Sequence, residues 1–207
     1  MVGIINVGVG NIRSIKNWLD RSIVNWDVID NPKDLINYSL IILPGVGSAS
    51  LFIDRLKKSG FFLELKNAHT RGQRMLGICL GAQVFMDYLE EDGGAEGLGF
   101  IKGHVLKLPI KNSNTGWLPF SFNLNDLSKA WLQNKVSISR KTKIKGRVFY
   151  NHNYGLLLTD NNVFSQFIDC DNLSPFSSII QKKNVIALQF HPEKSQELGE
   201  TLLKMLL

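Results

Sequence analysis

A cysteine between two glycines is the strongest chemical signal in the sequence. The run Gly77-Ile78-Cys79-Leu80-Gly81 follows an apolar stretch and precedes a helical pattern. This arrangement is typical of a nucleophile elbow, a sharp strand-to-helix turn at the carboxyl end of a sheet strand. The glycines remove Cβ atoms that would crowd the turn. The helix N-terminus favours a thiolate at Cys79, and the Leu80 amide points to where an oxyanion would form. A buried core cysteine is the simpler alternative, which the flanking glycines disfavour.

A thiol nucleophile needs a base, and one of the four histidines has the right setting for it. His191 ends a strongly apolar strand pattern at residues 185–190, whereas His69, His104 and His152 do not. Glu193 lies two residues further on, on the same side of an extended chain. Pro192 between them stiffens the pair. Cys79, His191 and Glu193 are therefore the predicted nucleophile, base and orienting group, and only the fold can bring them together.

The elements that must position these residues alternate in the first half of the chain. Continuous apolar strands separated by helices are typical of a parallel sheet that is covered on both faces. The patterns predict strands at residues 3–7, 26–30, 40–43 and 74–78, and helices at 11–21, 49–58, 61–69 and 82–89.

The second half consists mainly of strand patterns, which imply antiparallel pairing beside or onto the parallel sheet. They lie at residues 103–108, 147–152, 163–168, 177–181 and 185–190, and a helix follows at 197–206. No linker or repeat divides the chain. We expect one α/β domain over 1–207, an open, mixed, mostly parallel sheet with helices on both faces and antiparallel strands in the C-terminal half.

Composition excludes several classes of protein. Two cysteines in 207 residues are too few for a disulfide framework and favour a reducing, cytoplasmic setting. The start of the chain lacks a signal-peptide pattern, and no run approaches the ~20 apolar residues of a membrane span. No histidine or cysteine lies at metal-ligand spacing from Cys170, so we expect no metal site.

The net charge is +6, and much of the basic excess lies in residues 135–147. This segment lacks the interleaved aromatic residues that nucleic-acid binding would favour. A solvated surface is the main interpretation, and a partner-facing or phosphate-steering patch is the alternative.

Two motifs together resemble those of a known family. Residues 77–83, with Cys79 and Gln83, and the run Gln189-Phe190-His191-Pro192-Glu193 are similar to the motifs of class I (triad) glutamine amidotransferases. Within that family the closest resemblance is to the glutaminase subunits of imidazole glycerol phosphate synthase, and it runs from end to end. The stretches that carry it are 8–14, 43–47, 116–117 and 191–195.

The resemblance implies a reaction and a set of roles. Cys79 would attack the side-chain carboxamide of L-glutamine, His191 would move the proton, and Glu193 would orient His191. Ammonia would leave, and water would hydrolyse the γ-glutamyl thioester. The amides of Val46 and Leu80 would form the oxyanion hole. Substrate contacts are implied for Gly47, for Gln83, and for the backbone of His152, Asn153 and Tyr154. For His152, a purely structural histidine is an equally good interpretation.

The resemblance also implies a partner and no cofactor. The partner would be a (β/α)8-barrel cyclase of histidine biosynthesis, with Asn11, Lys194 and Ser195 near the interface. Ammonia is mostly protonated in neutral water, so delivery to a synthase requires a dry path and hence a complex. The Gly8-Val9-Gly10 loop is not a dinucleotide fingerprint, because Arg13 stands at the third glycine position.

Two other functions remain open at this point. Leu118-Pro119 follows Gly116-Trp117 where the family usually has Asn, Ala82 replaces a common Met, and residues 123–146 form a long connection. A divergent copy that feeds ammonia to a synthase for surface-sugar amination is one alternative. A catalytically silent binding or regulatory subunit is the other, and the intact triad disfavours it.

Overall fold

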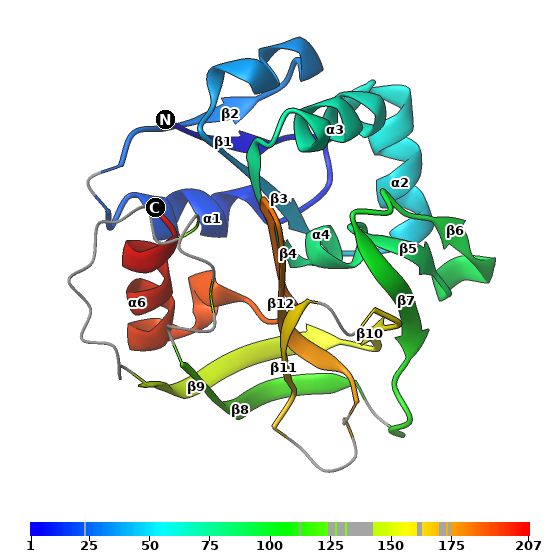
Figure 1. Cartoon of the computed structure of the whole chain (residues 1–207), viewed down its shortest axis with the longest axis vertical. Coiled ribbons are helices and arrows are strands. Elements are labelled where there is room, and N and C mark those ends of the chain that lie inside the picture. Colours follow the sequence, from blue (N-terminus) through cyan, green and yellow to red (C-terminus); the bar gives the residue numbers. More distant parts are fainter. Residues whose placement is uncertain are drawn as a thin grey trace.

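The computed structural model describes residues 1–22, 24–111, 113–123, 127, 131, 143–160, 163–169, 173 and 175–207. Most of the basic segment and Cys170 lie outside the described residues. The first half of the chain contains the predicted alternation of strands and helices (Figure 1). Its elements are β1 (Val2–Ile5), α1 (Ile12–Leu19), β2 (Trp26–Ile29), the 3-10 helix η1 (Pro32–Asn37), β3 (Leu40–Gly45), α2 (Ala49–Lys58), α3 (Phe61–Thr70), β4 (Arg74–Cys79) and α4 (Leu80–Gln83).

The second half is rich in strands, as the sequence predicts. It comprises β5 (Met86–Leu89), the 3-10 helix η2 (Glu91–Gly93), β6 (Ala95–Glu96), β7 (Ile101–Lys107), β8 (Asn114–Asn123), β9 (Lys143–His152), β10 (Tyr154–Leu158), β11 (Phe164–Phe167), β12 (Ser177–Lys182), β13 (Val185–Leu188), the 3-10 helix η5 (Pro192–Lys194) and α6 (Gln196–Leu206).

Eleven of these strands form one mixed sheet. Its order is β2-β1-β3-β4-β13-β12-β10-β7-β5-β6, and β11 pairs with β12. The strands from β2 to β13 are parallel, and from β12 onward the pairs are antiparallel except for β7 and β5, which are parallel. Strands β8 and β9 form a separate antiparallel ribbon. The predicted mixed α/β architecture is confirmed.

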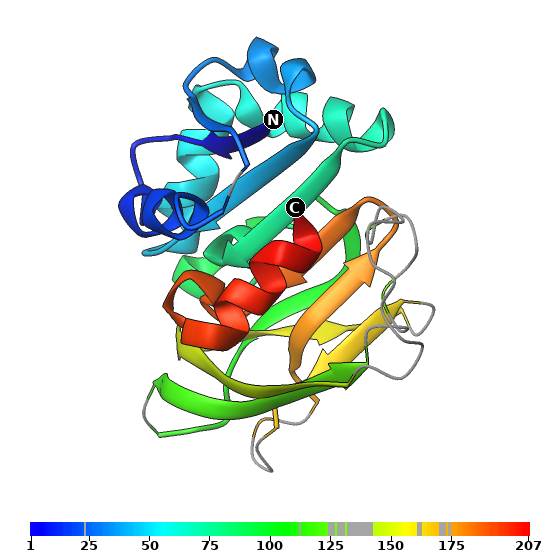
Figure 2. The same cartoon turned by 90° about the vertical axis from the view of Figure 1, so that its left-hand side faces the viewer.

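Helices cover both faces of the parallel part of the sheet. In Figure 1, α1 and α6 lie on one side of the central strands, and α2 and α3 lie on the other. Strand β3 has apolar side chains on both faces, so both faces need a cover. Ile42 points into the core shared with α1, α6 and the β8–β9 ribbon. Its neighbour Ile41 points into the core beneath α2 and α3. Figure 2 shows α6 lying across the strands above that ribbon.

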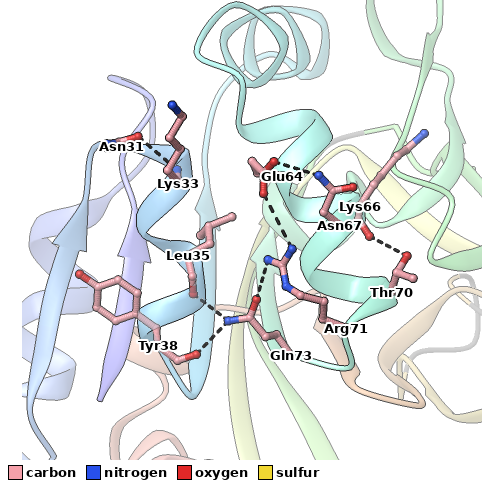
Figure 3. Close-up of polar contacts among 10 residues, drawn as sticks. All are labelled: Asn31, Lys33, Leu35, Tyr38, Glu64, Lys66, Asn67, Thr70, Arg71 and Gln73. Atoms are coloured by element: carbon pink, nitrogen blue, oxygen red, sulfur yellow. Dashed lines mark hydrogen bonds and ion pairs between the residues drawn. The ribbon is translucent and has the colours of Figure 1, made fainter.

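A small polar cluster holds the starts of β3 and β4 level with each other (Figure 3). The Gln73 amide, just before β4, donates to the carbonyl oxygens of Leu35 (2.7 Å) and Tyr38 (3.1 Å), just before β3. Arg71 donates to the other end of the Gln73 amide (3.1 Å) and lies 4.0 Å from Glu64 on α3. Because the starts are tied, the carboxyl ends of the two strands also meet at one level.

The helix predicted for residues 82–89 is wrong. Helix α4 ends at Gln83, and Met86–Leu89 is strand β5, which pairs with β7. Hydrogen bonds from later residues explain the difference: Leu98 N donates to Val84 O (2.7 Å) and Phe100 N donates to Phe85 O (2.9 Å). This long-range pairing overrides a local pattern that suits a helix.

Further differences concern strands. Strand β3 continues through Pro44-Gly45, beyond the predicted range 40–43, and the sequence patterns do not predict β6, β8 or β10. Among the described residues, no helix is both long and apolar enough to cross a membrane.

Candidate active site

Cys79 occupies the predicted elbow between β4 and α4. Its backbone has φ 53° and ψ −111°, a region that non-glycine residues rarely adopt, so the turn is strained. The neighbouring glycines permit it: a Cβ on Gly81 would collide with the Leu43 carbonyl oxygen, and one on Gly77 would lie 2.7 Å from Ala82 Cα. The side chain is 5% exposed and lies at the edge of a cleft.

The sheet register brings the base to the nucleophile. Strand β13 runs parallel to β4 with Leu188 opposite Ile78, so the chain leaving β13 passes beside the elbow. Nδ1 of His191 lies 2.8 Å from Oε1 of Glu193. Nε2 has no other hydrogen-bond partner among the described residues, which leaves it for the thiol. The three predicted catalytic residues are therefore assembled.

The pKa of His191 reflects its contacts with both Cys79 and Glu193. Burial by itself lowers the pKa of the imidazole, but the hydrogen bonds and charges of Cys79 and Glu193 outweigh it and raise the pKa to about 9. The arrangement favours an imidazolium next to the sulfur. An imidazole held in this way stabilises a thiolate and can return the proton to a leaving group.

Ser195 holds the backbone of this histidine. Its hydroxyl donates to the His191 carbonyl oxygen (2.6 Å) and accepts from the Phe149 amide (3.1 Å), and the His191 amide donates to Phe149 O (2.8 Å). The residue is 1% exposed. Its side chain therefore fixes the triad to β9 instead of offering the partner-facing surface that the resemblance implied.

A cleft of about 140 Å³ opens in front of Cys79. It gathers all the residues for which the resemblance implied oxyanion or substrate contacts, together with two that sequence reasoning missed, Glu91 and Asn151. The lining residues are Val46, Gly47, Cys79, Leu80, Gln83, Glu91, Asn151, His152, Asn153 and Tyr154. Strand register accounts for the position of Val46 and Gly47, because Gly45 pairs with Cys79 and the next two residues line the same cleft as the cysteine.

Glu91 and its neighbour Asp92 connect the cleft to the start of α2. Oε2 of Glu91 accepts from the Ala49 amide (2.9 Å), and burial is the main cause that raises the pKa of this carboxyl. Asp92 accepts from the hydroxyls of Ser48 and Ser50, the latter at 3.0 Å. These carboxylates therefore anchor the end of the loop that carries Val46 and Gly47. The acidic turn at 90–92 was the only sequence signal for them.

His152 is engaged by the protein through both ring nitrogens. Nδ1 lies 2.8 Å from the Tyr154 carbonyl oxygen, and Nε2 lies 2.9 Å from Nδ2 of Asn114. Burial is the main cause that lowers the pKa of His152, to about 4. Both ring nitrogens of His152 are thus occupied by protein groups, and the residue lines the cleft.

The remaining expected partner-facing residues lie close to the triad. Asn11 caps α1, with its side chain accepting from Ser14 N (3.4 Å), and it lines a narrow gap together with His191 and Glu193. The Lys194 ammonium lies 5.3 Å from the centre of the Phe149 ring, which also meets Trp117 edge-on at 5.8 Å. Among the described residues no group of three or more His, Cys, Asp or Glu side chains could hold a metal ion.

Comparison with known proteins shows the family of the chain. The family model described as "Glutamine amidotransferase class-I" matches residues 4–206. The chain belongs to the class-I glutamine amidotransferases. It is 34% identical to the imidazole glycerol phosphate synthase subunit HisH of a Geobacillus species, over 99% of this chain and 94% of that one. The resemblance inferred from the motifs is therefore confirmed.

Two further comparisons are informative. The chain is 31% identical to the chloroplastic imidazole glycerol phosphate synthase hisHF of Arabidopsis thaliana. The match covers 100% of this chain and 34% of that longer protein. Among solved structures, PurLQS from Thermotoga maritima superposes with a TM-score of 0.73 at 18% identity, covering 99% of this chain and 96% of that one. The latter likeness concerns the fold alone.

Proposed function

We propose that this chain is the glutaminase subunit of an imidazole glycerol phosphate synthase: it hydrolyses L-glutamine to glutamate and supplies ammonia to a cyclase. The observation that carries the proposal is the elbow cysteine next to a buried His191–Glu193 pair, at the edge of a cleft that Val46 and Leu80 also line. The HisH names of relatives at 30–34% identity support the choice of synthase.

In the first half-reaction the Cys79 sulfur is the nucleophile. Nε2 of His191 holds the proton of the thiol as an imidazolium, and the thiolate attacks the carboxamide carbon of glutamine. The negative charge that develops on the carboxamide oxygen is stabilised by the amides of Leu80 and Val46. His191 then gives its proton to the departing nitrogen. The C–N bond breaks, ammonia leaves, and a γ-glutamyl thioester remains on Cys79.

In the second half-reaction His191 acts as a base toward water. The neutral imidazole removes a proton as water attacks the thioester carbon, and the same oxyanion donors are used again. The C–S bond breaks, glutamate leaves, and the proton returns to the sulfur. Glu193 keeps the Nδ1 proton in place throughout, so Nε2 always faces the reacting atoms.

The charge pattern of the cleft supports an α-amino acid as substrate. Among the described residues that line it, Glu91 is the only carboxylate. It accepts one amide hydrogen bond through Oε2, which leaves Oε1 for a cation. We assign it to the α-ammonium group of glutamine, with Gly47 and the 152–154 backbone along the rest of the molecule.

The proposed partner is a (β/α)8-barrel cyclase. Ammonia that enters water at neutral pH becomes ammonium and is no longer a nucleophile, so the two sites must join. Asn11 lines a gap with His191 and Glu193, and Lys194 directly follows Glu193, and we assign both to the interface. The Arabidopsis thaliana relative, a longer protein named imidazole glycerol phosphate synthase hisHF, supports this association.

Identification of the partner tests this assignment directly. The chain, tagged and purified from its own cells, is expected to bring down a barrel cyclase, and glutamate release by that complex is expected to exceed release by the chain alone. Recovery of a sugar-amination synthase instead would overturn the histidine-pathway assignment. Equal glutamate release by wild type and Cys79→Ser in the complex would overturn the glutaminase assignment itself.

A further inference from the structure

The substrate cleft is backed by a chain of buried polar side chains that the mechanism above does not use. We propose that Asn114 and His152 are positioning residues for the substrate: together they hold the Tyr154 carbonyl group, which in turn orients the Gln83 amide toward the cleft. The inference rests on the proposed function, because it assigns a task in binding glutamine to residues that do not touch the reacting atoms.

The chain of contacts joins four elements around the cleft. Asn114 opens β8, His152 ends β9, Gln83 ends α4, and Gln189 directly follows β13. The Tyr154 carbonyl oxygen, at the start of β10, receives both His152 Nδ1 (2.8 Å) and Gln83 Nε2 (2.7 Å). All four side chains are at least nine-tenths buried, with exposures from 0% to 8%.

The chemistry of these groups fixes each proton. A carbonyl oxygen can only accept, so Nδ1 of His152 must carry a hydrogen. Nε2 of a neutral imidazole is then an acceptor, which matches the Asn114 Nδ2 group 2.9 Å away. Burial disfavours the charged form of His152, as does the nearby imidazole of His191. The Tyr154 carbonyl oxygen and the Asn114 amide thus favour the same tautomer of His152, one from each side of the ring.

The same reasoning orients Gln83. Its Nε2 group donates to Tyr154 O and lies 3.3 Å from Oε1 of Gln189, so both acceptors draw the NH2 end into the protein. Gln83 lines the cleft, and its carbonyl oxygen is the end left for a ligand. An acceptor in the cleft that also holds Glu91 suits the α-ammonium group of an amino acid. A flipped amide would instead present NH2 to that cation.

Loss of the Asn114 donor has a defined consequence. His152 could then carry its proton on Nε2, which would turn Nδ1 into an acceptor facing the Tyr154 carbonyl oxygen. One of the two donors on that carbonyl would be lost, and the Gln83 amide would be less firmly oriented. Binding of the amino-acid part of the substrate should weaken, while the chemistry at Cys79 should be almost unchanged.

The register of the β8–β9 ribbon provides a matched control. Asn114 lies opposite His152, and the next residue, Thr115, lies opposite Asn151. Thr115 Oγ1 donates to Asn151 Oδ1 (3.1 Å), so Thr115→Val also removes one cross-strand side-chain hydrogen bond. It leaves the contacts of His152 intact. A general weakening of the ribbon would therefore affect both variants equally.

The experiment combines spectroscopy with labelling by a glutamine analogue. Nitrogen-15 NMR of the full chain reports the tautomer of His152 directly, without any need for activity. Labelling of Cys79 by 6-diazo-5-oxo-L-norleucine gives a half-saturating concentration and a limiting rate. We expect an Nδ1–H imidazole in the wild type from pH 6 to 8, and unchanged labelling constants in Thr115→Val.

Two substitutions of Asn114 should behave differently. Asn114→Leu should raise the half-saturating concentration about tenfold, as expected for one hydrogen bond to a charged group, with the limiting rate within about twofold. Asn114→Asp offers an acceptor instead of a donor. His152 should then become an imidazolium at neutral pH, in a pocket where it also faces His191 and the Tyr150 ring, and the NMR signals should report it.

An Nε2–H or charged His152 in the wild type would overturn the inference, whatever the variants do. So would unchanged labelling constants in Asn114→Leu, or an equal loss in Thr115→Val. If the proposed function itself were wrong, Cys79 of the wild-type chain would not be labelled at all. Failure of the inference and failure of the proposed function can therefore be told apart.

Discussion

Oε1 of Glu193 lies 2.8 Å from Nδ1 of His191, and the side chains are 1% and 2% exposed, respectively. The pair is thus shielded from water on the side away from the sulfur. Such burial fixes the ring orientation and the tautomer together, so that Nε2 is always the atom presented to Cys79. The contribution of this pair to protein stability and its contribution to the reaction rate can be measured separately.

Protein stability should depend on pH through His191. Its pKa is about 9 in the folded chain and 6.5 in the unfolded reference, so the folded state binds the proton more tightly. The stabilisation is complete below pH 6.5 and is lost as the pH rises through 9. At about 1.4 kcal/mol per pKa unit it amounts to about 3 kcal/mol. Urea unfolding at pH 6, 8 and 10 measures it.

The control for this measurement is Cys79→Ala, which removes one of the two groups that raise the pKa of His191. The difference in unfolding free energy between wild type and variant should shrink between pH 6.5 and 9. If the unfolding free energies of the wild type and Cys79→Ala change with pH in parallel over this interval, the sulfur does not share a proton with the imidazole.

Glu193→Gln should separate orientation from packing. The amide has nearly the shape of the carboxylate but carries no charge, and it can present NH2 to Nδ1. That contact would favour the wrong tautomer of His191. The limiting rate of glutamine hydrolysis should fall on the order of 100-fold, the lower range of general acid–base contributions. Steady-state kinetics of the complex with the cyclase would measure this fall in rate. A limiting rate within twofold of wild type would argue against Glu193 as the residue that orients His191.

The loop that carries Val46 should depend on Asp92. This residue has φ 55° and accepts from Ser48 and Ser50 at the start of α2. Asp92→Gly keeps the left-handed backbone but removes the carboxylate, so the effect of the hydrogen bonds is isolated. The limiting rate at Cys79 should fall about fivefold, less than for loss of an oxyanion donor, with little change in half-saturating concentration. Asp92→Asn retains one acceptor, so its limiting rate should lie between those of the wild type and Asp92→Gly.

Gly199 should be essential for the placement of the His191-Pro192-Glu193 turn. A Cβ at this position would collide with the Pro192 carbonyl oxygen, because α6 packs directly on the turn. Gly199→Ala should cost about 1–3 kcal/mol of unfolding free energy, the usual range for overpacking, and should slow labelling of Cys79.

Gly146→Ala serves as the comparison for this substitution. Its Cβ would approach only the side chain of Leu198 on the same helix, with the nearest atom, Cδ2, at 3.3 Å. It should cost less than Gly199→Ala and leave labelling unchanged. Equal effects of the two substitutions would indicate that α6 packing in general, and not the turn, is responsible.

The sequence was sufficient for the triad because its local signals are strong. Glycines on both sides of Cys79 indicate the elbow, and Glu193 two residues after His191 indicates an oriented base. Glu91 could not be found in the same way. A helical pattern over 82–89 hid the strand that delivers it, and only pairing with β7 and hydrogen bonds from Leu98 reveal that strand.

Asn114 was missed for a related reason. Strand β8 contains Pro119, and its burial pattern is irregular, so nothing local predicts that it pairs with β9 over ten positions. The contact between Asn114 and His152 exists only because of that pairing. Residues whose role depends on long-range register are thus the ones that the amino-acid pattern leaves undetermined.

Mapping the covalent adduct of 6-diazo-5-oxo-L-norleucine is the most direct test of the account. Peptide mass spectrometry of the labelled full-length chain distinguishes the two cysteines, Cys79 and Cys170. The account predicts one adduct per chain, on Cys79, prevented by excess L-glutamine and absent in Cys79→Ser. An adduct on Cys170, or labelling that survives in Cys79→Ser, would contradict it.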